Sequence, residues 1–162
     1  MSDATVPPAP VSVLIRSATV SEAETIARVI RAAFLTVAEE LGFDIPPVHE
    51  TPSDVRSTFE AGDAVLVAEV DGAVVGTVRG ETLDDDGVMV RRLAVLPERR
   101  GTGIARGLML ALEDAYPAAS RFELFTGAEA VGPIALYTSL GYRIVESRRD
   151  MGFPLVYLEK CR

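Results

Sequence analysis

A short basic loop joins an apolar run to a helical pattern near the middle of the chain. The run VMVRRLAV covers Val88–Val95, Pro97 ends it, and Arg99–Gly103 (RRGTG) follows. From position 104 the apolar residues recur at helical spacing. Small residues let the backbone approach an anion, and the first N–H groups of a helix are unpaired and lie at the positive end of its dipole. The stretch therefore predicts a phosphate-binding loop. The alternative is a solvated surface turn, since a lone Gly-x-Gly is a weak motif.

The distribution of charge favours the phosphate-binding interpretation. The whole chain has a formal net charge of −8, yet residues 91–106 contain five arginines and only one acid, Glu98. An acidic protein is repelled by polyphosphate, so general binding to nucleic acid is not expected. The five arginines are Arg91, Arg92, Arg99, Arg100 and Arg106.

Length and composition predict one soluble domain. The chain has 162 residues, of which 48% are apolar, which is enough for a buried core. The single cysteine, Cys161, allows no intramolecular disulfide and fits a reducing compartment. No apolar run approaches the ~20 residues of a membrane helix, and the N-terminus does not resemble a signal peptide, so we expect a cytoplasmic protein. We expect a mobile tail over residues 1–11 and the domain over 12–162.

The elements that must position the loop follow from periodicity and from turn residues. A capping box at Ser21–Glu24 should open the first helix, and Asp71-Gly72 should form a hairpin turn. The resulting order is β-α-α-β-β-β-α-β-α-β-β. It predicts a mixed α/β or α+β domain with a largely antiparallel sheet and one central crossover. We expect strands over 13–19, 64–70, 73–79, 88–95, 121–126, 142–149 and 155–160, and helices over 21–40, 52–62, from 104, and 133–140.

The element order and two motifs resemble the GNAT superfamily of acyl-CoA-dependent N-acyltransferases. The family's pyrophosphate signature, Arg/Gln-x-x-Gly-x-Gly/Ala, is matched by Arg100-Gly101-Thr102-Gly103-Ile104-Ala105. Leu93-Ala94-Val95-Leu96-Pro97 precedes it, as the typical Leu-Ala-Val-x-Pro does. Residues 134–142 (IALYTSLGY) are similar to the second motif, I-x-L-Y-x-x-x-G-F/Y. The segments GFDIP at 42–46 and GFPLVY at 152–157 also resemble a bacterial subgroup.

This resemblance implies a GNAT-like fold, a central, mostly antiparallel twisted sheet that is split between the fourth and fifth strands and flanked by helices. It implies acetyl-CoA as co-substrate and no metal. The pyrophosphate would bind the N–H groups of residues 101–105 beside Arg100, and the pantetheine arm would pair with Leu93, Ala94 and Val95 on a strand that a bulge commonly distorts. Val95 N–H would stabilise the oxyanion, and Tyr137 would protonate the departing thiolate. For Tyr137, the alternative is a core tyrosine on an amphipathic helix.

The implied reaction is direct attack of a primary amine on the thioester through a tetrahedral intermediate. It needs a base, and here the chain departs from the subgroup, because Arg91-Arg92 stand where a strand carboxylate would fall and Pro133 replaces an asparagine. Glu81 or Glu123 would be the base, and Glu129 is a further candidate. The alternative, which the sequence favours for each of them, is an exposed carboxylate in a surface ion pair. His49, the only histidine, is more typical of a solvated loop.

The acceptor could be a small molecule, an amino acid or a peptide, and residues 35–60 should help to shape its site, Phe43 among them. Neighbouring residues on a strand point to opposite faces. We therefore expect one of Arg91 and Arg92 to face the acceptor cleft, where it would favour an acceptor that bears a carboxylate. No nucleic acid or membrane partner is expected. Dimers are common in the family.

Four other functions compare with this one. A dinucleotide-binding oxidoreductase needs a third glycine at position 106, where the chain has Arg106, and a P-loop needs Gly-Lys-Ser/Thr, which is absent. The third is an acyl-CoA-binding sensor or degenerate GNAT-fold protein, favoured by the missing strand carboxylate. An interaction module without CoA would require the basic loop to be plain surface.

Overall fold

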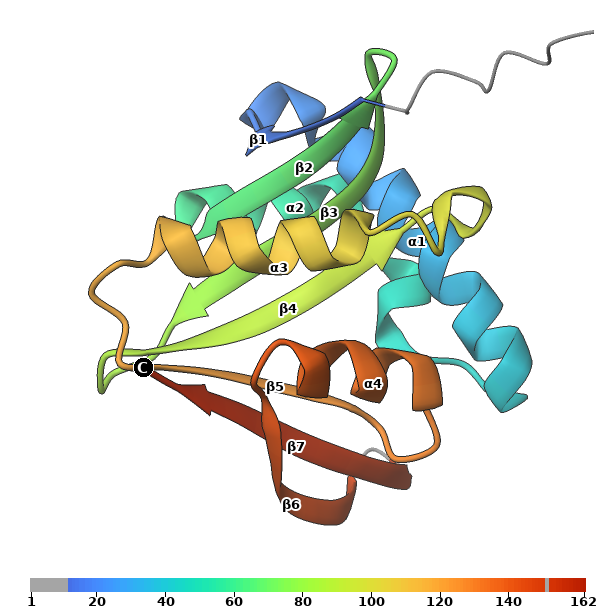
Figure 1. Ribbon diagram of the computed structural model, residues 1–162. Helices are drawn as coiled ribbons and strands as arrows, with labels where there is room; N and C mark the ends of the chain where they lie inside the picture. The colour runs from blue at the N-terminus through green and yellow to red at the C-terminus, as the bar shows by residue number, and fades with distance from the viewer. Residues whose placement is uncertain (1–11, 151) are drawn as a thin grey trace, which may run out of the picture.

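The computed structural model describes residues 12–150 and 152–162, so the tail predicted for residues 1–11 lies outside the described residues. A seven-stranded sheet forms its centre, in the order β1-β2-β3-β4-β5-β7-β6 (Figure 1). Every neighbouring pair is antiparallel except β4 and β5, which confirms the largely antiparallel sheet with one crossover. The strands are β1 Val13–Ser17, β2 Ala64–Val70, β3 Ala73–Thr82, β4 Gly87–Val95, β5 Arg121–Gly127, β6 Arg143–Asp150 and β7 Phe153–Cys161.

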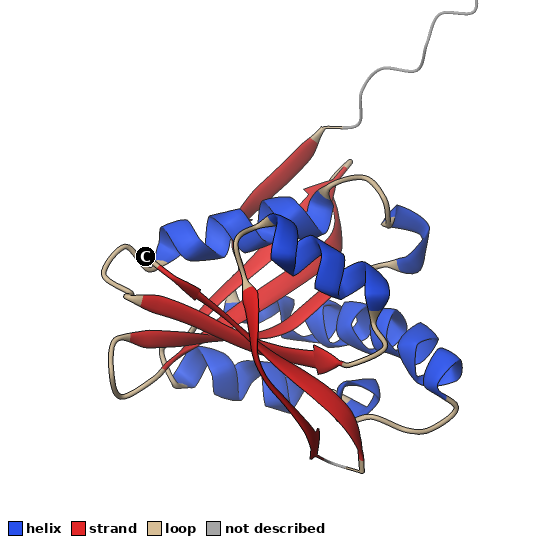
Figure 2. Cartoon of the chain, turned by 60° about the horizontal axis from the view of Figure 1, so that its bottom comes forward, coloured by secondary structure: helices blue, strands red, loops and turns tan. Residues whose placement is uncertain are grey.

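Helices cover both faces of the sheet (Figures 1 and 2). α3 and α4 lie on one face, where Leu108 and Tyr137 share a core with residues of β2–β5. α1 and α2 lie on the other face and pack against β2–β4 through a second core, which includes Ile26 and Val55. The helices are α1 Ala23–Leu41, α2 Pro52–Glu60, α3 Ile104–Ala115 and α4 Val131–Ser139, with short 3₁₀ turns over Val20–Glu22, Pro46–His49 and Pro97–Arg99.

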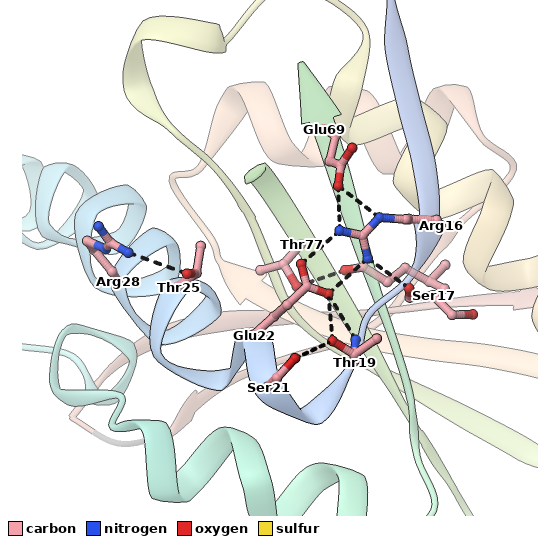
Figure 3. Close-up of polar contacts among 10 residues, drawn as sticks. Arg16, Ser17, Thr19, Ser21, Glu22, Thr25, Arg28, Glu69 and Thr77 are labelled. Carbon is pink, nitrogen blue, oxygen red and sulfur yellow. Dashed lines mark hydrogen bonds and ion pairs between the residues drawn. The ribbon is translucent and has the colours of Figure 1, made fainter. Parts of the chain in front are cut away.

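The first helix begins differently from the prediction. The capping box is formed by Thr19 and Glu22, not by Ser21 and Glu24, because a 3₁₀ turn precedes α1 and moves the start of the helical segment toward the N-terminus. Thr19 N–H donates to Glu22 Oε1 at 2.9 Å. Glu22 also accepts two hydrogen bonds from Arg16, which donates through Nε to Glu69 on β2 as well (Figure 3). This network ties the first strand, the first helix and β2 together.

The sheet divides between β4 and β5. The two strands pair only over Gly87–Met89 and Arg121–Glu123, after which they diverge. The predicted split is therefore present, and it leaves the C-terminal half of β4 without a partner on that side.

A β-bulge distorts β4 just before this open half. Thr77 pairs with Ala94 and Arg79 pairs with Arg91, so the single residue Val78 faces two residues of β4. One of the two, Arg92, has a left-handed backbone with φ of 54°. A left-handed arginine is uncommon and marks a bulge of the kind found beside active sites.

Candidate active site

The loop before α3 requires its two glycines. Gly101 and Gly103 have φ of 75° and 82°, in the left-handed region that side chains with a Cβ rarely adopt. A Cβ added to either would meet no atom within 4 Å, so the backbone conformation, not crowding, demands glycine. Thr102 closes the turn by donating from Oγ1 to the Arg99 carbonyl at 2.6 Å. The predicted glycine loop is thus a folded backbone cradle.

The N-terminus of α3 presents unpaired amides at this cradle. Gly103 is the N-cap residue, and no side chain caps the helix. The first N–H that reaches back into the helix belongs to Gly107, which donates to the Gly103 carbonyl at 3.0 Å. The N–H groups of Ile104 and Ala105 precede it and have no intrahelical acceptor, which is the arrangement that binds phosphate.

Arg100 is anchored to the first helix. Its Nη2 donates to the Ala33 carbonyl of α1 at 3.0 Å. Part of the guanidinium therefore fixes the loop against α1, while the charge remains beside the cradle. The contact spans 67 residues of sequence, which is why no local pattern could indicate it.

The open half of β4 offers free backbone groups. Leu96 N–H donates to the Val75 carbonyl of β3 at 2.9 Å. Because backbone groups of successive residues point to opposite edges of a strand, Val95 N–H points away from β3 and into the split. Its neighbour Ala94 pairs with Thr77 of β3 and is buried against α1, whereas Leu93 packs on the α3 side.

Tyr137 lies on α4 and is almost completely buried, at 9% exposure. Its ring packs edge-on against Tyr142, with centroids 6.1 Å apart. Burial raises the pKa of Tyr137 to about 12, so the phenol keeps its proton at neutral pH. Within the described residues no hydrogen bond engages the hydroxyl, which leaves it free to donate to a ligand.

A charged pocket of about 360 Å³ lies next to α2, on the face of the sheet that α1 and α2 cover. The expectation that Arg91 and Arg92 point to opposite faces is wrong, since both line this pocket. The bulge is the physical reason, because two residues of β4 occupy the place of one and the alternation is interrupted between them. The lining residues are Ser57, Thr58, Ala61, Asp63, Arg79, Glu81, Arg91 and Arg92.

Glu50 is a site residue that sequence reasoning missed. It is 3% exposed, and its carboxylate accepts hydrogen bonds from Arg79 Nη1 at 2.6 Å and Arg92 Nε at 3.3 Å. Its backbone carbonyl accepts from Arg31 Nη1 of α1 at 2.7 Å. Glu50 follows an irregular, proline-containing stretch, so nothing in its neighbourhood predicted burial. Burial lowers the pKa of the Arg92 guanidinium, and the negative charge of Glu50 partly offsets this decrease.

The candidate bases are occupied by arginines. Glu81 accepts from Arg91 Nε at 2.6 Å, and its side chain is 46% exposed. Glu123 accepts from Arg121 Nε at 3.1 Å. Glu129 is exposed on the loop before α4. Asp63 also lines the charged pocket, and burial, followed by the charge of Glu81, raises its pKa.

Two residues singled out in the sequence, Phe43 and His49, lie in the segment between α1 and α2. Phe43 follows α1 and is partly exposed, and its ring lies 4.9 Å from that of Phe153 at the start of β7. The two subgroup-like segments therefore contact each other. His49 pairs with Asp44, and both side chains are largely exposed, as expected for a solvated loop.

Neither a metal centre nor a membrane-spanning helix is present among residues 12–150 and 152–162. In that part of the chain no cluster of three or more histidine, cysteine, aspartate or glutamate residues is arranged to hold a metal ion. The helices described there are all too short or too polar to span a bilayer.

Comparison with known proteins agrees with this geometry. A family model described as "Acetyltransferase (GNAT) domain" matches residues 61–144, slightly more than half of the chain. The N-acetylaspartate synthetase of Danio rerio is 32% identical over an alignment of 115 residues, and the match covers 66% of this chain and 40% of that relative. The chain thus spans about two fifths of the length of the curated relative it matches.

Solved structures share the fold at low sequence identity. The PaiA N-acetyltransferase of Thermoplasma acidophilum, solved with coenzyme A, superposes with a TM-score of 0.78 at 16% identity, covering 93% of this chain and 99% of that one. YncA of Salmonella typhimurium, solved with acetyl-CoA, gives 0.76 at 20% identity, covering 92% and 93%. Together with the match to the family model, the split sheet and the glycine loop place this chain in a known group: it belongs to the GNAT acetyltransferase family.

Proposed function

We propose that this chain transfers an acetyl group from acetyl-CoA to the primary amine of a small molecule, an amino acid or a peptide. The observation that carries the proposal is the combination of two features at one place. The left-handed glycine loop at the uncapped start of α3 lies at the end of a strand whose other edge is open. Both features fit the phosphate and amide groups of acetyl-CoA, the ligand class named for PaiA and YncA.

The cradle would hold the co-substrate through backbone groups. The N–H groups over Gly101–Ala105 would bind the pyrophosphate, and Arg100 would add positive charge from its anchored position. The free edge of β4 over Leu93–Val95 would pair with the pantetheine amides, as an added strand pairs with a sheet edge. Acetyl-CoA supplies the activated acetyl thioester.

Two groups of this chain would act on the reaction. Val95 N–H, which points into the split, would stabilise the negative oxygen that forms as the amine nitrogen bonds to the carbonyl carbon. As the carbon–sulfur bond breaks, Tyr137 would give its proton to the thiolate. Glu81 or Glu123 would accept the proton that the amine loses, directly or through water, once its arginine partner releases it.

The name of one relative narrows the class of acceptor that we propose. The Danio rerio relative is named for the synthesis of N-acetylaspartate, the acetyl derivative of a dicarboxylic amino acid. That name, together with arginines in the charged pocket, supports amino acids over polyamines as acceptors of this chain.

An acyl-CoA-binding sensor is the second candidate. It is favoured by the ion pairs that engage Glu81 and Glu123, because a carboxylate oxygen that already accepts a hydrogen bond from arginine is not available to accept one from an amine. Calorimetry with acetyl-CoA and an acetylation assay over amino acids, peptides and amines separate the two. Binding with turnover supports the transferase, binding without turnover of any amine supports the sensor, and no binding at millimolar acetyl-CoA rejects both.

A further inference from the structure

Three guanidinium groups converge on the charged pocket. Arg79 comes from β3, and Arg91 and Arg92 come from β4. The side chains of Arg79 and Arg92 are only 14% and 24% exposed, so they are largely withdrawn from water while still lining the pocket. Holding partly desolvated cations together is unfavourable unless anions accompany them. Glu50 supplies one such anion inside the protein, because it accepts hydrogen bonds from both Arg79 and Arg92.

Two of these arginines have terminal nitrogens that remain available. Arg91 donates through Nε to Glu81, and Arg92 donates through Nε to Glu50. In the described part of the chain, no hydrogen bond engages Nη1 or Nη2 of either residue. A guanidinium with free terminal nitrogens is suited to bind a carboxylate with two hydrogen bonds. Two such groups on neighbouring residues can bind two carboxylates.

Glu50 fixes the arginines without occupying the pocket. Its buried carboxylate accepts from both Arg79 and Arg92, and it does not line the pocket itself. The bulge has the complementary effect, since the left-handed backbone of Arg92 brings its side chain to the same face as Arg91. The positions of the guanidinium groups are thus set before any ligand arrives.

The pocket also carries two acids, Asp63 and Glu81. With Glu50 these balance the three arginines, so the pocket has little net charge and its ligand must be recognised by individual pairs. Side chains of both signs complement a molecule that has carboxylates and an amine. A polyamine would place only cations against Arg79, Arg91 and Arg92, which is unfavourable.

From these contacts we infer that the charged pocket binds the acceptor through its carboxylates, and that the acceptor is a small amino acid with two of them. Arg91 and Arg92 each bind one carboxylate through the terminal nitrogens, and Glu50 positions Arg92. Arg92 precedes Val95 by three residues, roughly 10 Å along a strand, a separation that an arginine side chain and a small amino acid can bridge. This inference rests on the proposed acetyl transfer, because it names the acceptor of the same site.

A matched series of four amines tests the inference. L-Aspartate has both carboxylates, L-alanine lacks the side-chain carboxylate, β-alanine lacks the α-carboxylate, and ethylamine lacks both. We expect kcat/KM to fall about tenfold or more for each carboxylate removed. Arg91→Gln and Arg92→Gln should lower kcat/KM for aspartate at least tenfold, mainly through KM, and should reduce the ratio of kcat/KM for aspartate to that for ethylamine by a similar factor. Arg28→Gln is the control, since Arg28 is exposed on α1 and, within the part of the chain that the structure describes, hydrogen-bonds to Thr25 alone (Figure 3).

A binding measurement tests the acceptor pocket independently of the proposed acetyl transfer. Calorimetric titration of L-aspartate into CoA-loaded wild type, Arg92→Gln and the more conservative Arg92→Lys needs no turnover, and thermal melting shows whether each variant folds. If the enzyme acetylates ethylamine as efficiently as aspartate, the proposed acceptor pocket is rejected, whereas the proposed acetyl transfer stands. Equal kcat/KM values for aspartate and alanine would show that the pocket does not recognise a second carboxylate. Aspartate binding that depends on Arg92, without any acetylation, supports the pocket and rejects the transferase.

Discussion

Arg92 Nε lies 3.3 Å from the carboxylate of Glu50, a residue 42 positions earlier, and this contact links the loop after α1 to the bulge of β4. Glu50 is 3% exposed and binds Arg79 through its other oxygen. Removing one member of a buried ion pair leaves the others uncompensated. We therefore expect Glu50→Ala to lower the free energy of unfolding by about 3–5 kcal/mol, measured by urea denaturation.

Two further variants give this prediction its controls. Glu50→Gln keeps hydrogen-bond acceptance by the side-chain oxygen and should lose less stability than Glu50→Ala. Glu60→Ala removes an exposed acid at the end of α2 and should change stability by less than about 0.5 kcal/mol. Equal stability of Glu50→Ala and Glu60→Ala would show that the buried carboxylate stabilises nothing.

The glycine loop gives a second prediction. Gly103 has φ of 82°, so Gly103→Ala should cost about 1–2 kcal/mol of stability and, by shifting the amides at the start of α3, weaken acetyl-CoA binding about tenfold or more. Gly132→Ala is the matched control, because a Cβ at Gly132 meets open space and its φ is not left-handed. Calorimetry on both variants measures the binding. An acetyl-CoA affinity unchanged in Gly103→Ala would contradict a phosphate site there.

Tyr137 gives a third prediction. Tyr137→Phe should lower kcat about 100-fold with little change in acetyl-CoA affinity, because only the proton donor is lost. Burial places the pKa of Tyr137 at about 12, above its ordinary value of 10, so the phenol stays protonated and kcat should show no loss from its ionisation between pH 7 and 10. Steady-state rates across that range check both statements. A wild-type kcat in Tyr137→Phe would remove the phenol from the reaction.

The acid stability of the protein depends on the network in Figure 3. The hydrogen bonds from Arg16 lower the pKa of Glu22 to about 2, below its ordinary value of 4.5. A carboxyl with a depressed pKa stabilises the fold above the pKa of the unfolded chain, and this contribution is lost as pH falls from about 4.5 toward 2. Arg16→Met should therefore lower the melting temperature by several degrees at pH 7 and make it less dependent on pH in this window.

Thermal melts of wild type and Arg16→Met between pH 2 and 7 measure this difference. Arg28→Met is a suitable control, since Arg28 lies on α1, outside the network, and among the described residues its side chain hydrogen-bonds to Thr25 alone. Parallel melting curves for wild type and Arg16→Met across the whole range would contradict the role of the Arg16–Glu22 pair.

Local patterns predicted the elements and the cradle well. The Asp71-Gly72 turn has both residues in the left-handed region, as a two-residue hairpin requires. α3 begins at Ile104, where its apolar periodicity begins. These features depend on backbone preferences and side-chain spacing within a few residues, which a single sequence displays directly.

Contacts between distant segments were not predictable in this way. Arg100 bonds to Ala33, and Glu50 bonds to Arg79 and Arg92, across separations that no local pattern encodes. The shared face of Arg91 and Arg92 was mispredicted, because a bulge with a left-handed arginine interrupts the alternation and arginine gives no local indication of that backbone. The charged pocket therefore became visible only in three dimensions.

The bulge at Arg92 lets β4 place two consecutive arginines on one face without disturbing either core. Without the bulge, alternation would run straight through Arg92 and exchange the two faces for every residue that follows it. Leu93 and Val95 would then turn toward α1, and Ala94 would turn toward α3, which would leave one core overfilled and the other with a void. Deleting Arg92 would instead keep Leu93 and Ala94 on their present sides, at the loss of one arginine from the charged pocket. The extra residue in the strand is therefore what adds a second charge to the pocket face while both cores stay packed.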